Sequence, residues 1–189
     1  MTITQNNTRQ ERVAFDPDAE RVALESIEIM GTGTKADFER VIHPDCVNHE
    51  AKDEPPASRV PYGPEAVRAT ALWLRAAYSD LRWEIHDVVA ERDLVVVHCT
   101  MSGRHTGLFI AYDEDGGVDE VFPPTGEEFA TTQTHWLRIE DGKLIEHWAN
   151  RDDLGTAKQL KWVPPTPAYL FRMALAKRRA KRAHRRDAS

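Results

Sequence analysis

The hydrophobic period of this chain changes once, near residue 80, and this change restricts the folds that the chain can adopt. Before it, apolar residues recur every three or four positions, which is the spacing of an amphipathic helix. After it, apolar and polar residues alternate, which is the spacing of a strand with one buried face. Helices followed by consecutive strands predict an α+β domain in which the helices pack on one face of a curved antiparallel sheet.

Local start and stop signals place three helices before residue 80. Asp16-Pro17 combines a favourable N-cap with the residue that suits the first helical position, and His43-Pro44 is typical of a helix end. Residues 45–50 are expected to be extended, and residues 54–61, with three prolines, to form a loop. The predicted helices span residues 16–30, 35–42 and 63–78.

Four strands are predicted after residue 80, at residues 81–86, 95–101, 128–139 and 143–152. Asp141-Gly142 lies between the last two strands and is the strongest hairpin signal in the chain. An acidic segment that runs to Pro124 contains a further turn signal at residues 113–117. The second half of the chain therefore reads as a series of antiparallel strands.

The formal net charge of −6 averages two unlike parts of the chain. Residues 171–189 carry eight basic side chains and one acid, a net +7, whereas residues 1–170 carry 17 basic and 30 acidic side chains, a net −13. We divide the chain into a flexible arm (1–15), a globular domain (16–162) and a Pro-rich linker with a basic, helix-competent tail (163–189). The tail is expected to pack on the acidic body or on a dimer mate. Binding of nucleic acid or of an anionic membrane is the less favoured alternative.

The composition excludes several classes of protein. A chain of 189 residues with 41% hydrophobic residues can form one packed domain and is not wholly disordered. The N-terminus lacks the basic and apolar segments of a signal peptide, and no stretch approaches the ~18 apolar residues of a membrane span. Cys46 and Cys99 form no Cys-x-x-Cys arrangement, so a cytoplasmic location is expected. The histidine spacings predict no metal site.

The hairpin predicted at residues 128–152 carries the candidate site. Gln133 and His135 share a face with Phe129 and Leu137, which must be the buried face. Unpaired buried polar groups cost about 1–3 kcal/mol each, so a cavity open at one end explains this interior better than a closed core. An acid in such apolar surroundings has a raised pKa, which suits general acid/base catalysis. Unbroken alternation puts a second set on the same face of the returning strand: Leu144, Glu146, Trp148, Asn150 and Asp152.

Two of these residues have structural alternatives that the pattern leaves open. His135 could be an interior histidine that is satisfied by Gln133 or by a backbone group. Asp152 could cap the short helix suggested by residues 153–160, because Asp is a favoured N-cap. The capping and catalytic roles of Asp152 do not exclude each other.

Several motifs, taken in order, resemble the SnoaL-like polyketide cyclase family, whose members are often labelled ester cyclases. The resemblance extends from about Ala19 to Leu160. The matching segments are Val47-Asn48-His49-Glu50-Ala51, Ser102-Gly103-Arg104-His105-Thr106-Gly107, Pro123-Pro124-Thr125-Gly126, Arg138-Ile139-Glu140-Asp141-Gly142-Lys143, Glu146-His147-Trp148, Asp152-Asp153-Leu154-Gly155 and Gln159-Leu160.

The resemblance implies a fold, an assembly and a chemistry. The fold is a cone-shaped sheet wrapped around helices, as in nuclear transport factor 2, and the assembly is a homodimer formed through the sheet. The chemistry is ring closure of a polyketide ester by intramolecular aldol condensation, without metal or cofactor. Two departures stand out: Ala149 occupies a position where many members have an acid, and residues 109–123 are longer than the usual connection and are expected to cover the pocket mouth.

The family match also implies roles for individual residues. Asp152 and His135 are the predicted catalytic residues, and the predicted substrate-binding residues are Asn48, His49, His105, Gln133 and Trp148. The expected function is acid/base chemistry on a small hydrophobic carbonyl compound. One alternative is a non-catalytic binder of small hydrophobic ligands with the same fold. Another is an epoxide hydrolase-like enzyme that uses Arg151-Asp152, although alternation puts these two side chains on opposite faces.

Overall fold

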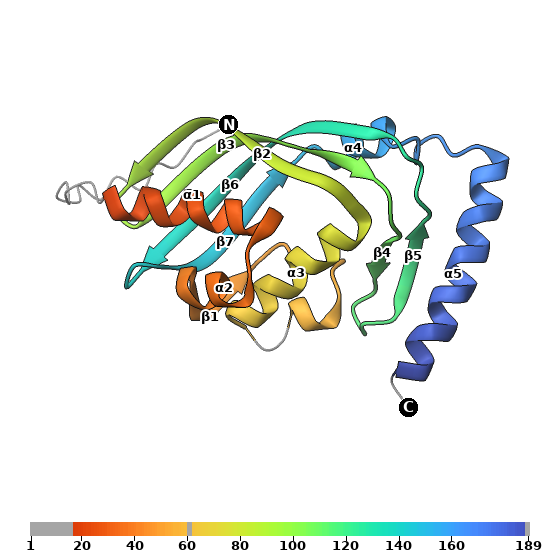
Figure 1. The fold of residues 1–189 in the computed structure, drawn as a ribbon, viewed down its shortest axis with the longest axis horizontal. Coiled ribbons are helices and arrows are strands. Elements are labelled where there is room, and N and C mark those ends of the chain that lie inside the picture. The colour runs from red at the N-terminus through yellow and green to blue at the C-terminus, as the bar shows by residue number, and fades with distance from the viewer. Residues whose placement is uncertain (1–16, 60–61, 188–189) are drawn as a thin grey trace, which may run out of the picture.

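The computed structural model describes residues 17–59 and 62–187 (Figure 1). Its helices are α1 (Pro17–Thr32), α2 (Lys35–Val41), α3 (Pro64–Ala77), α4 (Asp153–Gln159) and α5 (Pro167–Asp187), with a short 3-10 helix at Pro56–Ser58. Its strands are β1 (Ile42–Asn48), β2 (Tyr78–Glu91), β3 (Leu94–His105), β4 (Phe109–Tyr112), β5 (Val118–Phe122), β6 (Glu128–Glu140) and β7 (Lys143–Arg151). The predicted helices and strands are confirmed, whereas the predicted arm at residues 1–15 and the predicted N-cap Asp16 lie outside the described residues.

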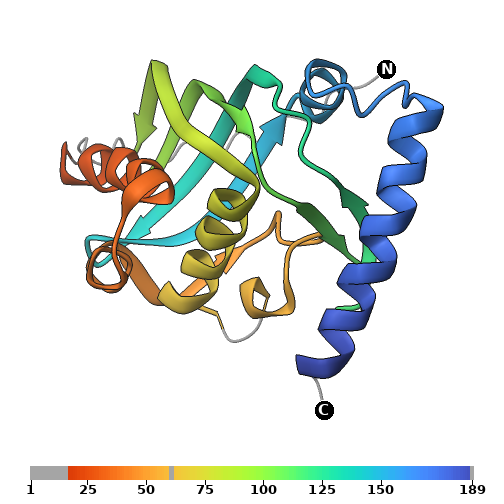
Figure 2. The same ribbon diagram turned by 45° about the vertical axis from the view of Figure 1, so that its right-hand side comes forward.

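Five strands form the main sheet in the order β1-β7-β6-β3-β2. Neighbouring strands are antiparallel except β1 and β7, which pair in parallel. The sheet is curved, and α1, α2 and α3 lie together on one of its faces (Figures 1 and 2). This arrangement confirms the predicted α+β fold, and no helix of the described residues covers the opposite face of the sheet.

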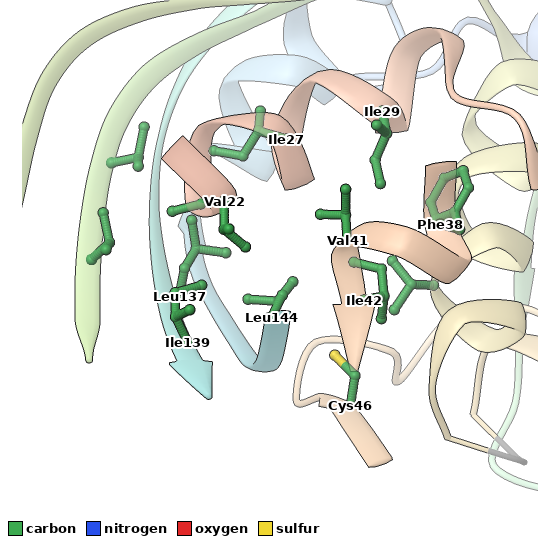
Figure 3. Packing of buried hydrophobic residues seen from close by; sticks show 14 of the residues in the cluster. Val22, Ile27, Ile29, Phe38, Val41, Ile42, Cys46, Leu137, Ile139 and Leu144 are labelled. Atoms are coloured by element: carbon green, nitrogen blue, oxygen red, sulfur yellow. The ribbon is translucent and has the colours of Figure 1, made fainter. Parts of the chain in front are cut away.

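A hydrophobic core fills one end of the space between these helices and the sheet (Figure 3). Phe38 and Val41 of α2 and Val22 of α1 pack there at 0–3% exposure, as their helical spacing requires. Leu137 and Leu144 supply the sheet side of the contact. Burial of one such side chain contributes about 1.5–3 kcal/mol to the free energy of folding, so this core holds the helices firmly against the sheet.

Strand β6 follows its predicted alternation along its whole length. Its burial alternates residue by residue from Glu128 to Glu140, and Gln133 and His135 are buried with Phe129 and Leu137. The turn that follows has Asp141 at φ 50° and Gly142 at φ 71°, the left-handed pair that a two-residue hairpin of this type requires. The predicted hairpin is therefore confirmed.

Strand β7 departs from its predicted alternation. Ile139 pairs with Leu144, but the preceding Arg138 pairs with Glu146, so the strand has one extra residue, Ile145, at a bulge. Cross-strand partners share a face, and His147 lies opposite the inward-facing Leu137. The prediction for the returning strand is wrong beyond Leu144, because one inserted residue turns every later side chain to the other face. The inward set is His147, Ala149 and Arg151, and the outward set is Glu146, Trp148 and Asn150.

The acidic excursion of the sequence folds as a second, two-stranded sheet of β4 and β5. Helix α5 lies alongside it at the edge of the molecule (Figures 1 and 2). The buried Tyr169 donates its hydroxyl to the Pro123 carbonyl at 3.0 Å, and Lys177 pairs with Glu120 at 2.7 Å. Tyr169 is thus buried against the body, whereas Leu170 and Phe171 of the same apolar segment are exposed. Among the described helices, none has the length and apolar character needed to cross a membrane.

Candidate functional site

A cavity of about 280 Å³ lies between the N-terminal helices and the sheet. Most of its wall is apolar and aromatic, with contributions from both halves of the chain. The aromatic lining residues are Trp73, Tyr78, Trp83, Phe109, Phe129 and Trp162. Polar groups also line it, chiefly Asn48, Glu54, Gln133, His135, His147 and Arg151. This combination of a large apolar wall with a few polar side chains is typical of a site for a small organic molecule.

Four of the polar residues form one continuous hydrogen-bonded row across three strands. Gln133 Oε1 lies 2.9 Å from His135 Nε2, and His135 Nδ1 lies 2.9 Å from His147 Nε2. His147 Nδ1 in turn lies 2.9 Å from Asn48 Oδ1. The row runs from β6 through β7 to the end of β1. The extra residue in β7 is what brings His147 to this face, so the bulge helps to build the site.

The number of protons in this row is not fixed. When the amide oxygens of Gln133 and Asn48 both face the histidine rings, each can only accept a hydrogen bond. The three bonds of the row then need three protons on the ring nitrogens, whereas two neutral imidazoles carry only two. One added proton completes the row. A neutral row is completed when the Gln133 amide turns and donates from Nε2, because Asn48 Oδ1 also accepts from the backbone N–H of Glu50 at 3.2 Å. The row can therefore take up or release one proton with every bond kept.

Burial holds both histidines of the row in the neutral form. It lowers the pKa of His135 to about 4, with the positive charge of Arg151 acting in the same direction. Burial also lowers the pKa of His147 well below its usual value, and the neighbouring His135 and Arg151 add to this effect. The row is thus neutral at pH 7 and is a set of dipoles rather than a fixed charge.

Glu54 places a buried carboxyl in the cavity wall. Its side chain is 3% exposed and accepts a hydrogen bond from the Thr70 hydroxyl of α3. Burial raises the pKa of Glu54 to about 7, and the Thr70 hydrogen bond and the charge of Arg151 partly oppose this rise. Sequence reasoning missed Glu54 because the residue starts a proline-rich loop, and its burial arises from contacts with distant segments.

Two predicted substrate-binding residues lie outside the cavity lining. Trp148 faces the outer side of the sheet, where its ring stacks on His49 with the centroids 4.7 Å apart and the planes at 5°. Arg138 lies over the same tryptophan at 5.9 Å. The prediction of Trp148 as a pocket wall is wrong because of the β7 bulge, and His49 is on the outer side with it.

His105 is fully buried but does not line the cavity either. Its ring contacts Tyr78 and makes an edge contact with Trp162 at 5.2 Å. Its Nδ1 accepts from the backbone N–H of Thr125 at 3.3 Å, and its backbone bonds to Glu127 and Gly126. Burial lowers the pKa of His105 to about 4. This histidine fastens the loop before β6 and is not placed to contact a ligand.

Asp152 is the N-cap of α4. Its Oδ1 accepts from the backbone N–H of Gly155 at 2.8 Å, and its exposed side chain is not among the cavity-lining residues. The sequence left a capping role and a catalytic role open for Asp152, and the structure places this residue in the capping role. The cavity-lining Arg151 pairs with the exposed Asp153 at 3.6 Å rather than with Asp152. Within residues 17–59 and 62–187, no three His, Cys, Asp or Glu side chains are grouped to hold a metal ion.

Comparison with known proteins places the chain in a family. The model of the SnoaL-like polyketide cyclase family matches residues 20–160. The aklanonic acid methyl ester cyclase DnrD of Streptomyces peucetius is 32% identical over 143 residues, which cover 75% of this chain and 89% of that protein. The nogalonic acid methyl ester cyclase of Streptomyces nogalater is 29% identical over 135 residues, covering 71% of this chain and 90% of that protein.

Solved structures share the fold at lower identity. TsrD from Streptomyces laurentii superposes with a TM-score of 0.61 at 24% identity, covering 78% of this chain and 98% of that one. An NTF2-like protein from Burkholderia thailandensis superposes with a TM-score of 0.51 at 16% identity, covering 75% of this chain and 95% of that one. The predicted NTF2-like fold is therefore confirmed, and by its family match this chain belongs to the SnoaL-like polyketide cyclase family.

Proposed function

We propose that the protein closes a ring in a hydrophobic carbonyl compound by an intramolecular aldol-type reaction, using acid/base groups of its own chain. The observation that carries this proposal is the neutral row of Gln133, His135, His147 and Asn48 in an otherwise aromatic cavity. Membership of the cyclase family and the names of its relatives support the same reaction class.

The row supplies what a developing enolate oxygen needs. Gln133 Nε2 donates to the Met101 sulfur at 3.2 Å, and a thioether is a weak acceptor. A substrate carbonyl oxygen is a stronger acceptor, so this N–H is free to turn to it. The Gln133 amide carries two N–H groups, so one can complete the neutral row at His135 while the other is left for the substrate oxygen. Donors of this kind act most strongly on the charged transition state, in a site that excludes water.

The reaction is an isomerisation and needs no external oxidant or reductant. A base removes a proton from the carbon next to one carbonyl, and the enolate carbon then bonds to a second carbonyl carbon of the same molecule. The oxygen of that second carbonyl becomes an alkoxide, which takes a proton to give a hydroxyl. The aromatic wall would hold both carbonyl groups close together, which favours ring closure over reaction with water.

Turnover of two defined esters tests the proposal. Aklanonic acid methyl ester and nogalonic acid methyl ester are incubated with the full chain, and an isomer of unchanged mass is sought by chromatography and mass spectrometry. His135→Phe should lower turnover about 100-fold, because it breaks the row and removes the ring that orients Gln133, the donor to the developing oxyanion. The matched control is His98→Phe, since His98 lies on the neighbouring strand β3 with a half-exposed side chain on the outer face. Binding of either ester without turnover would favour the alternative of a non-catalytic ligand-binding protein.

A homodimer formed through the outer face of the sheet, in the cytoplasm, is part of the same proposal. No helix between residues 17 and 187, in the described part of the chain, covers this face, which presents Trp136 at 40% and Val89 at 65% exposure. Burial of these side chains against a second copy would remove apolar surface from water. Light scattering should give a dimer mass for the wild type and a monomer mass for Trp136→Asp. A monomeric wild type at micromolar concentration would reject the dimer.

A further inference from the structure

We infer that Glu54 is the proton-transfer group of the cavity: its carboxylate takes the proton from the substrate carbon and returns it to the new hydroxyl. This inference rests on the proposed function and names the residue that performs its chemistry. It replaces Asp152, whose carboxylate is engaged as the cap of α4. The inward position beside His135 cannot serve, because Ala149 there has no proton to exchange.

Burial separates Glu54 from the other acids around the cavity. Four carboxyl residues line it in the described part of the chain: Glu50, Asp53, Glu54 and Asp153. Asp53 and Asp153 are exposed and Glu50 is partly exposed, whereas Glu54 is 3% exposed. A substrate that met one of these exposed carboxylates would remain in contact with water on that side. Among these four acids, Glu54 is the one whose carboxyl would contact a substrate in a region shielded from solvent.

The loop that carries Glu54 is held in place from two sides. The guanidinium of Arg59 donates to the Glu54 carbonyl at 2.8 Å and to the Asp113 carbonyl at 2.8 Å. The backbone N–H of Tyr112 donates to the Asp53 carbonyl at 3.0 Å, which joins the loop to β4. The Thr70 hydroxyl then orients the carboxyl from the side of α3. These bonds restrain the loop and hold the Glu54 carboxyl in the cavity wall.

The charges around the carboxyl suit a group that both accepts and donates a proton. Burial raises the pKa of Glu54 to about 7, with Asp53 adding slightly, while Thr70 and Arg151 oppose the rise. His135 and His147, across the cavity on β6 and β7, are neutral and leave this balance in place. A base is most effective when its pKa lies close to the working pH, because it is then ionised often enough and still binds a proton strongly.

The step balances within one molecule of substrate. The Glu54 carboxylate accepts the proton as the carbon–hydrogen bond breaks and the enolate forms at the row of Gln133, His135, His147 and Asn48. The enolate carbon forms the new carbon–carbon bond, and the second carbonyl becomes an alkoxide. The protonated Glu54 gives the same proton to that alkoxide and returns to its ionised form. One carboxyl therefore serves both halves of the reaction.

A purely structural role for Glu54 predicts different behaviour. In that case its bond with Thr70 would serve only to anchor the loop, and Glu54→Gln, which keeps the shape and a hydrogen-bonding oxygen, would retain turnover. In either role, a buried acid with a raised pKa stabilises the fold at low pH and loses that contribution as pH rises through about 7. Glu54→Gln should therefore raise the melting temperature relative to wild type more at pH 8 than at pH 5, even as turnover is lost.

The experiment compares Glu54→Gln, Glu54→Asp and Asp152→Asn with wild type on the same two esters. Glu54→Gln should lower turnover at least about 100-fold, in the range for loss of a general base, while ester affinity measured by tryptophan fluorescence stays within about threefold. Glu54→Asp should recover part of the rate, and Asp152→Asn should match wild type. Thr70→Val should move the acidic limb of the pH–rate profile to higher pH, because it removes a donor that favours the ionised carboxyl.

Infrared spectroscopy without substrate gives an independent measurement. The wild type should show a protonated-carboxyl carbonyl band that disappears near pH 7, and Glu54→Gln should lack it. Full turnover in Glu54→Gln, or a wild type without that band at pH 6, would overturn this inference and leave the proposed function intact. A wild type that turns over neither ester would overturn the proposed function and this inference together.

Discussion

His105 and His135 show that two buried histidines of one sheet can serve different purposes. Burial lowers the pKa of each to about 4. His135 has polar side chains on both ring nitrogens and lines the cavity. His105 lies among aromatic rings and accepts from the backbone of Thr125. Burial and a lowered pKa are thus common to both, and the row of polar partners reaching a cavity distinguishes the candidate site.

The largest effect is expected from opening the closed region around His105. Leu160 is fully buried in the aromatic cluster there and is not a cavity-lining residue. Leu160→Ala should lower the free energy of unfolding by about 2–5 kcal/mol, because it leaves a void in a packed cluster. Urea titration measures this loss, and ester affinity in the remaining folded protein should stay near wild type. Leu154→Ala is the matched control, since Leu154 is 57% exposed on α4. An equal loss in both variants would reject the closed packing of this region.

A second, smaller effect concerns the pH dependence of stability, which the two histidines should share. Each binds its proton more weakly when folded, with a pKa of about 4 against 6.5 in the unfolded chain. The unfolded state therefore takes up more protons between these values, and stability falls as pH falls from 6.5 towards 4. The loss is of the order of 2–3 kcal/mol for each histidine.

Variants of the two histidines would then separate their roles. His105→Phe and His135→Phe should each flatten the decline in the free energy of unfolding between pH 6.5 and 4, measured by urea titration at several pH values. Turnover should fall in His135→Phe and persist in the folded fraction of His105→Phe. If His105→Phe abolished turnover at full stability, the distinction between the two regions would be wrong.

The smallest effect is expected at Asp152, which lies between the two regions at the start of α4. Asp152→Ala should lower the free energy of unfolding by about 1 kcal/mol, the usual cost of losing an N-cap side chain. Asp152→Asn should cost less, because asparagine caps equally well. Neither change should alter turnover per folded molecule. A loss of turnover in Asp152→Asn at wild-type stability would show that Asp152 takes part in catalysis.

The polar side of the cavity was predictable where the backbone is regular. Alternation along β6 gives the inward positions of Gln133 and His135, whereas Asn48 was predicted from the family resemblance. Alternation fails on β7, because the bulge at Ile145 has no residue-type signal and reverses Trp148 and His147. The extra residue Ile145 therefore turns Trp148 away from the cavity and brings His147 into the hydrogen-bonded row.

Glu54 was unpredictable for a different reason. Its sequence neighbours Asp53 and Pro55 indicate a solvated loop, and no periodicity marks the carboxyl as buried. Its burial depends on Thr70 and on the hairpin of β4 and β5, segments 16 and more than 50 residues away in the chain. Local patterns report local structure, whereas the setting of this acid is produced by contacts between distant segments.

The docking of α5 connects the basic tail, through the hairpin of β4 and β5, to the loop that carries Glu54. Tyr169 and Lys177 fasten α5 to β5 and the residue that follows it, β5 pairs with β4, and the turn between them receives the Arg59 guanidinium that also holds the Glu54 carbonyl. The family model ends at residue 160, before this helix begins. Helix α5, which lies outside the family domain, thus supports the loop that carries Glu54, although no residue of α5 lines the cavity.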